Sequence, residues 1–317
     1  MNLKQKAPLS IVHRADVRSL FALLALGIII SFLSPHFLTS YNLINILVQA
    51  SILTIVTIGE TLVIFSGSFD LSLGSVLGLT NVLVAGLLVN AKVDMFSAIG
   101  VALLLGTGIG LLNGLIINFG RVPSFLATLG MLVAARGAAL IYTDGSTISM
   151  LPRHFVYLGK GALLGIPILV IVFVVLAGLA HIMMSRTKIG RHIYAVGGNE
   201  QAAIVSGLNT KKIKIFVFAA AGFLTGVGGT LLSARLDSGY PWSGYGYELD
   251  AIAATVLGGN RLMGGAGTIY QSVIGALIMV MLSNALDLLN VNPFYHFVAK
   301  GLVIILATLG SVKGIVK

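Results

Sequence analysis

The chain has 317 residues, of which 57% are hydrophobic and 9% are charged, and its mean hydropathy is +1.01. So few charged residues cannot cover a water-facing surface, which excludes a soluble globular protein and indicates an integral membrane protein. The formal net charge of +10 does not indicate a nucleic-acid partner, because no soluble basic domain carries it. The absence of cysteine excludes disulfides, thiolate catalysis and cysteine-based metal sites.

Apolar segments long enough to cross a membrane recur along the whole chain. A hydrocarbon core about 30 Å thick needs about 20 residues of helix, at about 1.5 Å each. The apolar residues run too continuously for the strands of a β-barrel, so helices must satisfy the backbone in lipid. We therefore expect an all-α integral membrane protein, a polytopic bundle of about ten transmembrane helices, near residues 18–33, 43–66, 72–89, 96–117, 123–142, 163–184, 215–235, 249–266, 269–286 and 294–312.

The eighth of these spans is interrupted. Its apolar run, residues 251–257, is too short to cross the membrane and is followed by GGNRLMGGAG. Lys and Arg gather on the cytoplasmic side of short loops. With about ten spans and the N-terminus inside, the Lys and Arg residues of the loops lie on the inner side, except Lys92, Arg153 and Lys160. If the eighth crossing were omitted, Arg261 would lie on the outer side. We therefore expect a broken or re-entrant helix in the C-terminal half, with cytoplasmic N- and C-termini.

Glycine-rich stretches occur within the apolar segments, among them GTGIGLLNG at residues 106–114 and GFLTGVGG at residues 222–229. Small residues let helix backbones approach one another closely in lipid, where no hydrophobic force acts between helices. We expect these stretches to pack helix against helix rather than to bind a ligand.

Two acidic stretches stand just before a resumed apolar segment, SFDLSLGS at residues 68–75 and YELDAIAA at residues 247–254. In transporters, broken segments at matching places in the two halves of the chain indicate the substrate path. Asp70 can instead cap the following helix or accept backbone hydrogen bonds, and both interpretations stay open. The candidate residues for a translocation path or gate are Ser66, Asp70, Ser72, Asp250 and Asn260.

The longest polar interruption is the loop of residues 185–214, which lies between two predicted spans. Asn199 is a favourable N-cap, Glu200 falls in the first helical turn, and Gly207 can end the helix in a left-handed conformation. The pair Asn209–Thr210 can cap the next span. The sequence therefore predicts a short exposed helix flanked by positive charge, which is either an ordinary solvated connection or a docking surface for a soluble partner.

Charged residues inside predicted spans are Glu60, Arg136 and Lys300, at positions where an unpaired charge is costly. We expect structural pairing of these charges rather than an ion relay. In particular, we predict that Lys300 pairs with Asp287, because the expected topology places both at the outer side.

An aromatic and acidic loop precedes the eighth span on the predicted outer side. Aromatic residues are common at the membrane interface, so interfacial anchoring and contact with a binding protein or a sugar are both open. The candidate contact residues are Tyr240, Trp242 and Tyr245.

Three stretches carry a family resemblance, SGSFDLSLGS (66–75), IGRHIYAVGGNEQAAIVSGLNTKKIKI (189–215) and YELDAIAATVLGGNRLMGGAGT (247–268). They closely resemble the ribose-type permeases of bacterial binding-protein-dependent ABC importers. The resemblance extends from about Asn42 to Lys313. The chain departs from the usual pattern of that family at Ser68 and Phe69, and again at residues 260–262.

The resemblance implies a single transmembrane permease domain over residues 1–317, embedded in the lipid of the bacterial inner membrane. It implies a permease dimer, made of two copies or of one copy and a relative, with ATPase subunits inside and a periplasmic sugar-binding protein outside. ATP and Mg would bind the ATPase subunit, because this chain has no GxxxxGK[ST] loop and binds no cofactor itself. By this resemblance, Glu200, Ala202, Ala203 and Gly207 match the coupling pattern that docks on the ATPase. The candidate residues of the ATPase-coupling loop are Gly198, Asn199, Glu200, Ala202, Ala203 and Gly207.

We therefore expect a permease subunit of an ATP-driven ABC importer that moves a monosaccharide such as ribose across the inner membrane. One alternative is a secondary transporter driven by an ion gradient, in which Glu60, Asp70 and Lys300 would serve ion coupling and the chain alone would take up substrate. Another is the same ABC architecture with a non-sugar solute. An enzyme would need a convergent nucleophile, base or metal set, and we expect no catalytic or metal site here.

Overall fold

The computed structural model describes residues 9–313, with the side chains of residues 17–305. The two chain ends of the predicted domain, whose cytoplasmic position the sequence predicts, lie outside the described residues. Two pairs of short strands accompany the helices: β1 (Ile148–Ser149) with β4 (Ser238–Gly239), and β2 (Ala162–Leu163) with β3 (Ile166–Pro167). In chain order, the helices are α1 (Leu9–Leu33), α2 (Ser40–Phe65), α3 (Leu73–Val89), α4 (Met95–Gly120), α5 (Ser124–Thr143), α6 (Arg153–Lys160), α7 (Ile168–Arg186), α8 (Lys188–Gly198), α9 (Glu200–Val205), α10 (Thr210–Leu236), α11 (Tyr247–Leu257), α12 (Ile269–Leu288) and α13 (Pro293–Lys313).

Six of the described helices, α2, α4, α5, α7, α10 and α12, are long and apolar enough to cross a membrane, and α1, α3 and α13 contribute shorter apolar stretches. These helices confirm a polytopic membrane bundle. The predicted eighth span differs from the others, because α11 has only 11 residues and reaches about half way across a core of about 30 Å. Its predicted continuation is not helical. Residues 258–268, here named the glycine loop, join α11 to α12 without regular structure.

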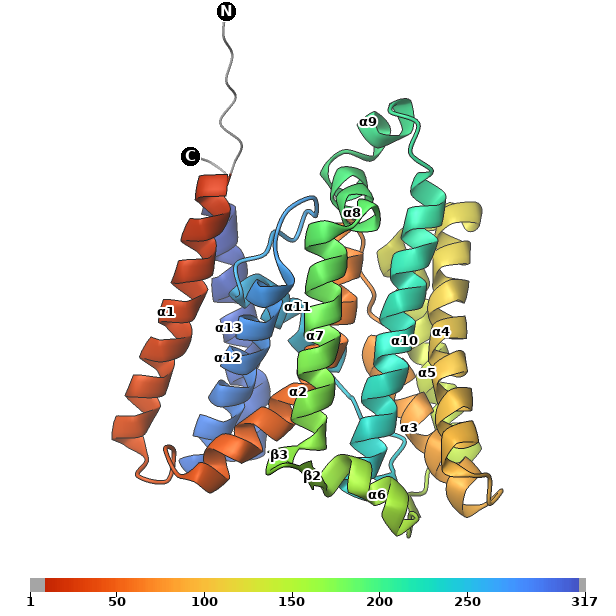
Figure 1. Ribbon diagram of the computed structural model, residues 1–317, viewed down its shortest axis with the longest axis vertical. Helices are drawn as coiled ribbons and strands as arrows, with labels where there is room; N and C mark the ends of the chain where they lie inside the picture. Colours follow the sequence, from red (N-terminus) through yellow and green to blue (C-terminus); the bar gives the residue numbers. More distant parts are fainter. Residues whose placement is uncertain (1–8, 314–317) are drawn as a thin grey trace, which may run out of the picture.

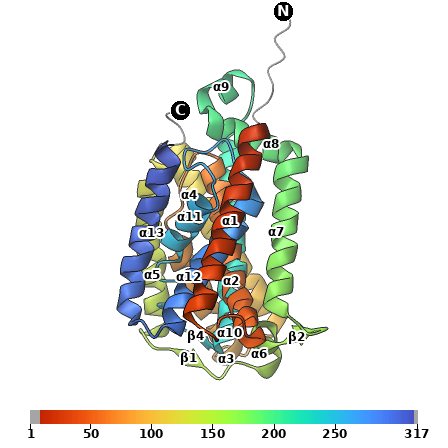
Figure 2. The ribbon, with the colours of Figure 1, turned by 90° about the vertical axis from the view of Figure 1, so that its left-hand side faces the viewer.

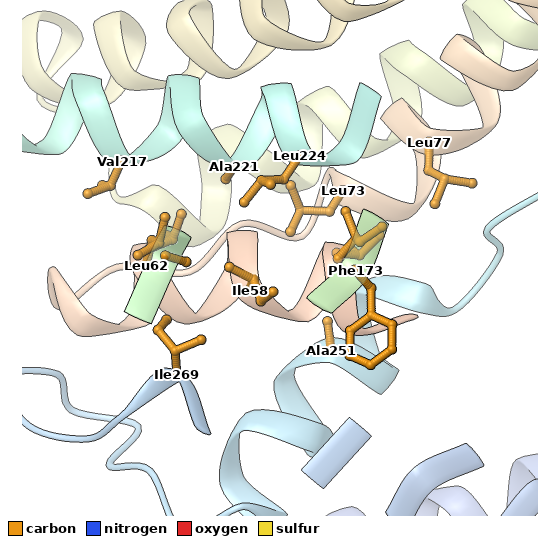
Figure 3. Packing of buried hydrophobic residues seen from close by; sticks show 14 of the residues in the cluster. Ile58, Leu62, Leu73, Leu77, Phe173, Val217, Ala221, Leu224, Ala251 and Ile269 are labelled. Carbon is orange, nitrogen blue, oxygen red and sulfur yellow. The ribbon is translucent and has the colours of Figure 1, made fainter. Parts of the chain in front are cut away.

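Helix α2 lies at the centre of the bundle. In the most apolar 18 residues of α2, 83% of the residues are buried, whereas the corresponding shares are 22% in α4, 17% in α5 and 22% in α7. Its side chains Ile58 and Leu62 belong to one apolar cluster (Figure 3) with side chains of α3, α7, α10, α11 and α12, among them Leu73, Phe173, Val217, Ala221, Ala251 and Ile269. The helices with low burial therefore lie at the periphery, as expected for segments that face lipid.

Glycines bring α4 and α10 into backbone contact, as their sequence predicts. A methyl group placed on Gly110 would lie 2.2 Å from the carbonyl oxygen of Phe218, and one on Gly222 would lie 2.2 Å from that of Gly106. No residue larger than glycine fits at this separation without displacing a helix. The predicted packing role of both glycine-rich stretches is confirmed.

The two ends of the bundle carry different short elements. The beginning of α1 and the end of α13 lie at the end that carries α9, and α6 with strands β2 and β3 lies at the opposite end (Figures 1 and 2). We name them the α9 end and the α6 end. Helix α6, which begins after Pro152, was not predicted from the sequence. The predicted sixth span corresponds to α7, which begins at Ile168 rather than near residue 163 because residues 162–167 form a hairpin. The turn of that hairpin contains Leu164 and Gly165, both with positive φ.

Candidate functional site

The loop of residues 185–214 projects from the α9 end (Figure 1) and folds into α8 and α9. The Asn199 side chain caps α9 by accepting a hydrogen bond from the Ala202 amide at 2.9 Å. After α9, Gly207 adopts a left-handed conformation with φ of 81°. Asn209 then caps α10 by accepting a hydrogen bond from the amide of Lys212 at 3.0 Å. These caps confirm the local structure predicted for the second half of the loop.

The first half of this loop is also helical, which the sequence analysis did not predict. Residues Lys188–Gly198 form α8, capped by Thr187, whose hydroxyl accepts a hydrogen bond from the Gly190 amide at 3.3 Å. The signal for it was present in Thr187 and in the apolar spacing of Ile193 and Val196, which are buried. Glycines at both ends of that stretch obscured the pattern.

The surface of α9 is small, partly apolar and basic at its flank. Val205 is 89% exposed, and a shallow depression of about 400 Å³ lies beside it, lined by Ile204, Gly207, Leu208, Asn209, Thr210 and Lys211. Glu200 is held by Lys214, with Oε2 and Nζ 2.6 Å apart. Of the predicted coupling residues, Ala203 is buried and Glu200 is half-buried, while the exposed ones are Gly198, Asn199, Ala202 and Gly207. The arrangement offers a soluble protein an accessible, shallow docking surface.

Asp70 and Ser72 lie in a buried polar cluster just before α3, and Ser66 is buried at the end of α2. The Asp70 carboxylate accepts hydrogen bonds from the Ser72 amide at 2.9 Å and from the Ser72 hydroxyl at 2.6 Å. Asn113 donates to that same hydroxyl at 3.0 Å. Ser66 donates to the carbonyl of Val63 at 2.7 Å. The N-cap of α3 is Ser72, so Asp70 closes the turn before the helix rather than capping it.

The Lys300 ammonium forms an ion pair with Asp250, with Nζ and Oδ2 2.6 Å apart. The predicted pairing of Lys300 with Asp287 is therefore wrong. Asp287 lies near the end of α12 with a 60% exposed side chain, and its Oδ1 lies 3.9 Å from Nε2 of His296. Lys300 instead lies two turns into α13 and faces the start of α11, which sequence spacing alone does not show.

A polar cavity of about 240 Å³ adjoins this ion pair. Asp250 and Lys300 both line it, whereas the other candidate path residues, Ser66, Asp70, Ser72 and Asn260, lie outside its wall. The remaining lining residues are Gln49, Leu53, Arg235, Tyr247, Met279, Val280, Ser283 and His296. Amide, hydroxyl, carboxylate and guanidinium groups thus surround a space comparable to a small polar solute.

The aromatic loop between α10 and α11 lies at the α6 end, and its aromatic side chains are half-exposed or exposed. Trp242 and Tyr245 meet edge to face with ring centroids 6.2 Å apart, and the amide of Tyr240 donates to the Asn81 side chain at 2.8 Å. Arg136 supports the loop from α5. Its guanidinium donates to the carbonyls of Pro241 and Ser243 and lies 5.7 Å from the Trp242 ring centroid.

Among residues 17–305, whose side chains the structure describes, no three His, Cys, Asp or Glu side chains converge in a way that could hold a metal ion. The polar features that the structure brings together are instead the projecting α9, the cavity beside Asp250 and the aromatic loop. They occupy different elements and both ends of the bundle. Such an arrangement suits passage and docking of partners rather than chemistry at one centre.

Residues 42–308 match the family model described as "Branched-chain amino acid transport system / permease component". The chain is 44% identical to the ribose import permease protein RbsC of Haemophilus influenzae over 300 residues, which cover 93% of both chains. It is 45% identical to the protein of that name from Escherichia coli over 298 residues, 93% of this chain and 92% of the relative. The D-allose transport system permease protein of Escherichia coli is 34% identical over 306 residues, 96% of this chain and 94% of that relative. No solved structure matches the chain.

The matched region extends from the first turn of α2 into α13, so it includes α8, α9, the cavity and the aromatic loop. The similarity to full-length transport permeases identifies a multi-pass protein of the bacterial inner membrane that transports rather than catalyses. The chain therefore belongs to the branched-chain amino acid transport system / permease component family, the permease subunits of ABC importers.

Proposed function

We propose that this chain is the transmembrane permease of an ATP-driven importer for ribose or a related monosaccharide. The observation that carries the proposal is an identity of 42–45% to ribose import permeases over about nine-tenths of the chain. More distant relatives are permeases for D-allose, L-arabinose and xylose. Since these names share a class of small polyhydroxylated solute, the substrate class is a monosaccharide.

The proposed assembly assigns one partner to each end of the molecule. An ATPase subunit, which holds ATP and Mg, docks on α9 in the cytoplasm, where Gly198, Asn199, Glu200, Ala202, Ala203 and Gly207 form or support the contact. A periplasmic sugar-binding protein docks at the α6 end, on Tyr240, Trp242 and Tyr245. A second permease, identical or related, completes the pathway. The whole chain forms one domain of about ten crossings, of which α11 and the glycine loop make a broken one.

The cavity beside Asp250 is the proposed position of the sugar on its path. Sugar hydroxyls both donate and accept hydrogen bonds, and the lining supplies a carboxylate, an ammonium and an amide within one small space. Gln49, Asp250 and Lys300 would contact the solute. Ser66, Asp70, Ser72 and Asn260 are instead bonded to neighbouring groups, so we assign them to the walls that support the path and gate.

Uptake by the reconstituted importer tests this function. The chain, its ATPase and its binding protein are incorporated in proteoliposomes, and radiolabelled ribose uptake is measured with and without internal ATP, in competition with D-allose, xylose or leucine. We expect uptake that requires ATP and is reduced by a sugar. Uptake by this chain alone, driven by an ion gradient, would contradict the ABC mechanism. ATP-dependent uptake of radiolabelled leucine, with none of radiolabelled ribose, would assign an amino acid substrate, in keeping with the family description.

Gly207 provides a variant that tests docking at α9. Val at this position must adopt a left-handed conformation, with φ of 81°, at a cost of about 1–2 kcal/mol. We expect Gly207→Val to distort the end of α9 and reduce ATPase recovery in affinity purification by about tenfold. Gly145→Val is a matched control, because Gly145 also has positive φ, 69°, and open space around it, but follows α5 at the α6 end. Equal ATPase recovery from both variants would remove α9 from the docking role.

A further inference from the structure

Three segments far apart in the chain meet directly beneath α9. They are α8, the C-terminal end of α2, and the glycine loop. The amide of Gly265 donates to the carbonyl of Phe65 at 3.2 Å, which joins the glycine loop to α2. A methyl group on Gly197 would lie 1.9 Å from that same carbonyl oxygen and 2.8 Å from the Gly265 nitrogen. The three backbones are therefore in contact, with no room for a side chain between them.

Tyr194 of α8 adds the one side-chain hydrogen bond between α8 and the glycine loop among the described residues. Its hydroxyl donates to the carbonyl of Gly267 at 2.8 Å. Its ring lies against Phe65, with centroids 5.2 Å apart. Burial raises the pKa of Tyr194 to about 12, so the hydroxyl remains a proton donor at neutral pH. The contact thus holds α8 to both of the other segments at once.

The glycine loop is in turn fastened to the membrane-embedded core. The Asn260 side chain accepts a hydrogen bond from the Thr268 amide at 2.8 Å and donates to the Ser272 hydroxyl of α12 at 2.7 Å. Thr61 of α2 donates to that hydroxyl at 2.7 Å, and its own oxygen lies 3.1 Å from the Thr255 hydroxyl of α11. A continuous set of bonds therefore runs from α8 through the glycine loop to α2, α11 and α12.

We propose that Tyr194 is a positioning residue that fastens the ATPase-docking helix α9 to the glycine loop, so that movement of α9 displaces α11 and α12. Helix α9 is joined covalently to α8 on one side and to α10 on the other. Without the Tyr194 contact, the movement of α9 would reach α7 and α10 along the chain, and it would reach the glycine loop only through the backbone packing at Gly197 and Gly265. With the contact, it also reaches α11, whose Asp250 lines the cavity. This inference rests on the proposed docking of an ATPase at α9.

The variant Tyr194→Phe tests the proposal, because it removes the hydroxyl and keeps the ring against Phe65. In the reconstituted importer, we expect ATPase binding and ATP hydrolysis as in the unmodified protein, but about fivefold fewer sugars transported per ATP hydrolysed, the equilibrium equivalent of one net hydrogen bond. Tyr157→Phe is a matched control. The Tyr157 hydroxyl also donates to a backbone carbonyl, that of Ala162 at 3.0 Å, but at the α6 end. Its transport ratio should not change.

A distance measurement gives a second readout that does not depend on transport. The chain has no cysteine, so Val205→Cys in α9 and Met263→Cys in the glycine loop, which are 89% and 81% exposed, can carry the only two spin labels. If the segments move together, the distance distribution between the labels stays the same with and without ATP. In the Tyr194→Phe background we expect it to shift or broaden when ATP is added.

The outcomes separate this proposal from the proposed function. If the unmodified chain recovers no ATPase, the proposed function fails before any variant is made. If the ATPase binds and Tyr194→Phe retains both the transport ratio and an ATP-independent label distance, the importer stands and the positioning role of Tyr194 is overturned. A reduced ratio in Tyr194→Phe and an unchanged one in Tyr157→Phe would support it.

Discussion

Asp250 and Lys300 show how a pair of charges can be accommodated within a membrane bundle. Their side chains are 10% and 27% exposed, and their oxygen and nitrogen atoms are 2.6 Å apart. Removing one partner of such a pair leaves the other charge without compensation in a poorly hydrated site. Removing both does not, so the energetic effects of the two single changes should not be additive.

A double-mutant cycle tests this expectation. Asp250→Asn and Lys300→Met should each lower the free energy of unfolding by about 2 kcal/mol, a value discounted from that of a fully buried pair because the Lys300 side chain is partly exposed. The double variant should lose less than the sum. Urea denaturation of the purified protein in detergent measures the effect. Asp287→Asn, at a 60% exposed carboxylate, is the control and should change little; purely additive losses would contradict the pairing.

At the scale of helices, the contact between α4 and α10 depends on the absence of side chains. Gly110 faces the backbone of α10 at a separation that excludes a methyl group, whereas Gly108, two residues earlier on α4, has no atom near its missing side chain. The same helix therefore has one face for protein and another that is open. Comparing substitutions at these two glycines therefore separates the steric effect of an added side chain from the general effect of glycine on helix propensity.

The variants Gly110→Val and Gly108→Val should differ accordingly. We expect Gly110→Val to separate α4 from α10 and to lower the free energy of unfolding by about 3 kcal/mol, the upper end of the usual cost of overpacking a close-packed core. Gly108→Val should be close to neutral, because its methyl groups meet open space. The yield of monodisperse protein and the melting temperature in detergent measure both. Similar losses in the two variants would mean that the α4–α10 contact is not tight in the membrane.

The sequence could predict features that depend on neighbouring residues, but not contacts between residues far apart in the chain. The caps at Asn199 and Asn209 and the left-handed Gly207 depend on a few neighbouring residues, and these predictions hold. Lys300 was assigned the wrong partner, because its neighbour depends on how α11 and α13 pack. The Tyr194 contact was missed for the same reason, since it joins residues that are 73 positions apart.

At the scale of the whole molecule, the proposed function requires the α9 end to be cytoplasmic and the α6 end to be periplasmic. Two exposed positions mark these ends: Val205 in α9 and Leu164 in the hairpin near α6, 89% and 96% exposed. Because the chain lacks cysteine, a single Cys introduced at either position is the only reactive thiol.

Labelling with a membrane-impermeant maleimide should therefore distinguish the two sides. Val205→Cys should react in inside-out vesicles and Leu164→Cys in right-side-out vesicles, each at least about tenfold faster than in the opposite orientation, because a charged reagent crosses the hydrocarbon core poorly. Detergent-solubilised protein should react at both positions, which controls for reactivity. Labelling of both positions from the same side would contradict the proposed topology, in which α7 crosses the membrane between Leu164 and Val205.

The burial of α2 bears on how the protein is made. Thr54, Thr57, Glu60 and Thr61 of α2 are all fully enclosed by neighbouring helices, although the helix is long and apolar enough to enter a membrane alone. During biosynthesis α2 emerges before α3, α7, α10, α11 and α12, so a nascent chain would hold these polar groups in lipid until later helices arrive. Helix α2 is therefore synthesised before the helices that bury it. Its polar side chains would stay exposed to lipid until those later helices pack around it, or until an insertion factor shields them.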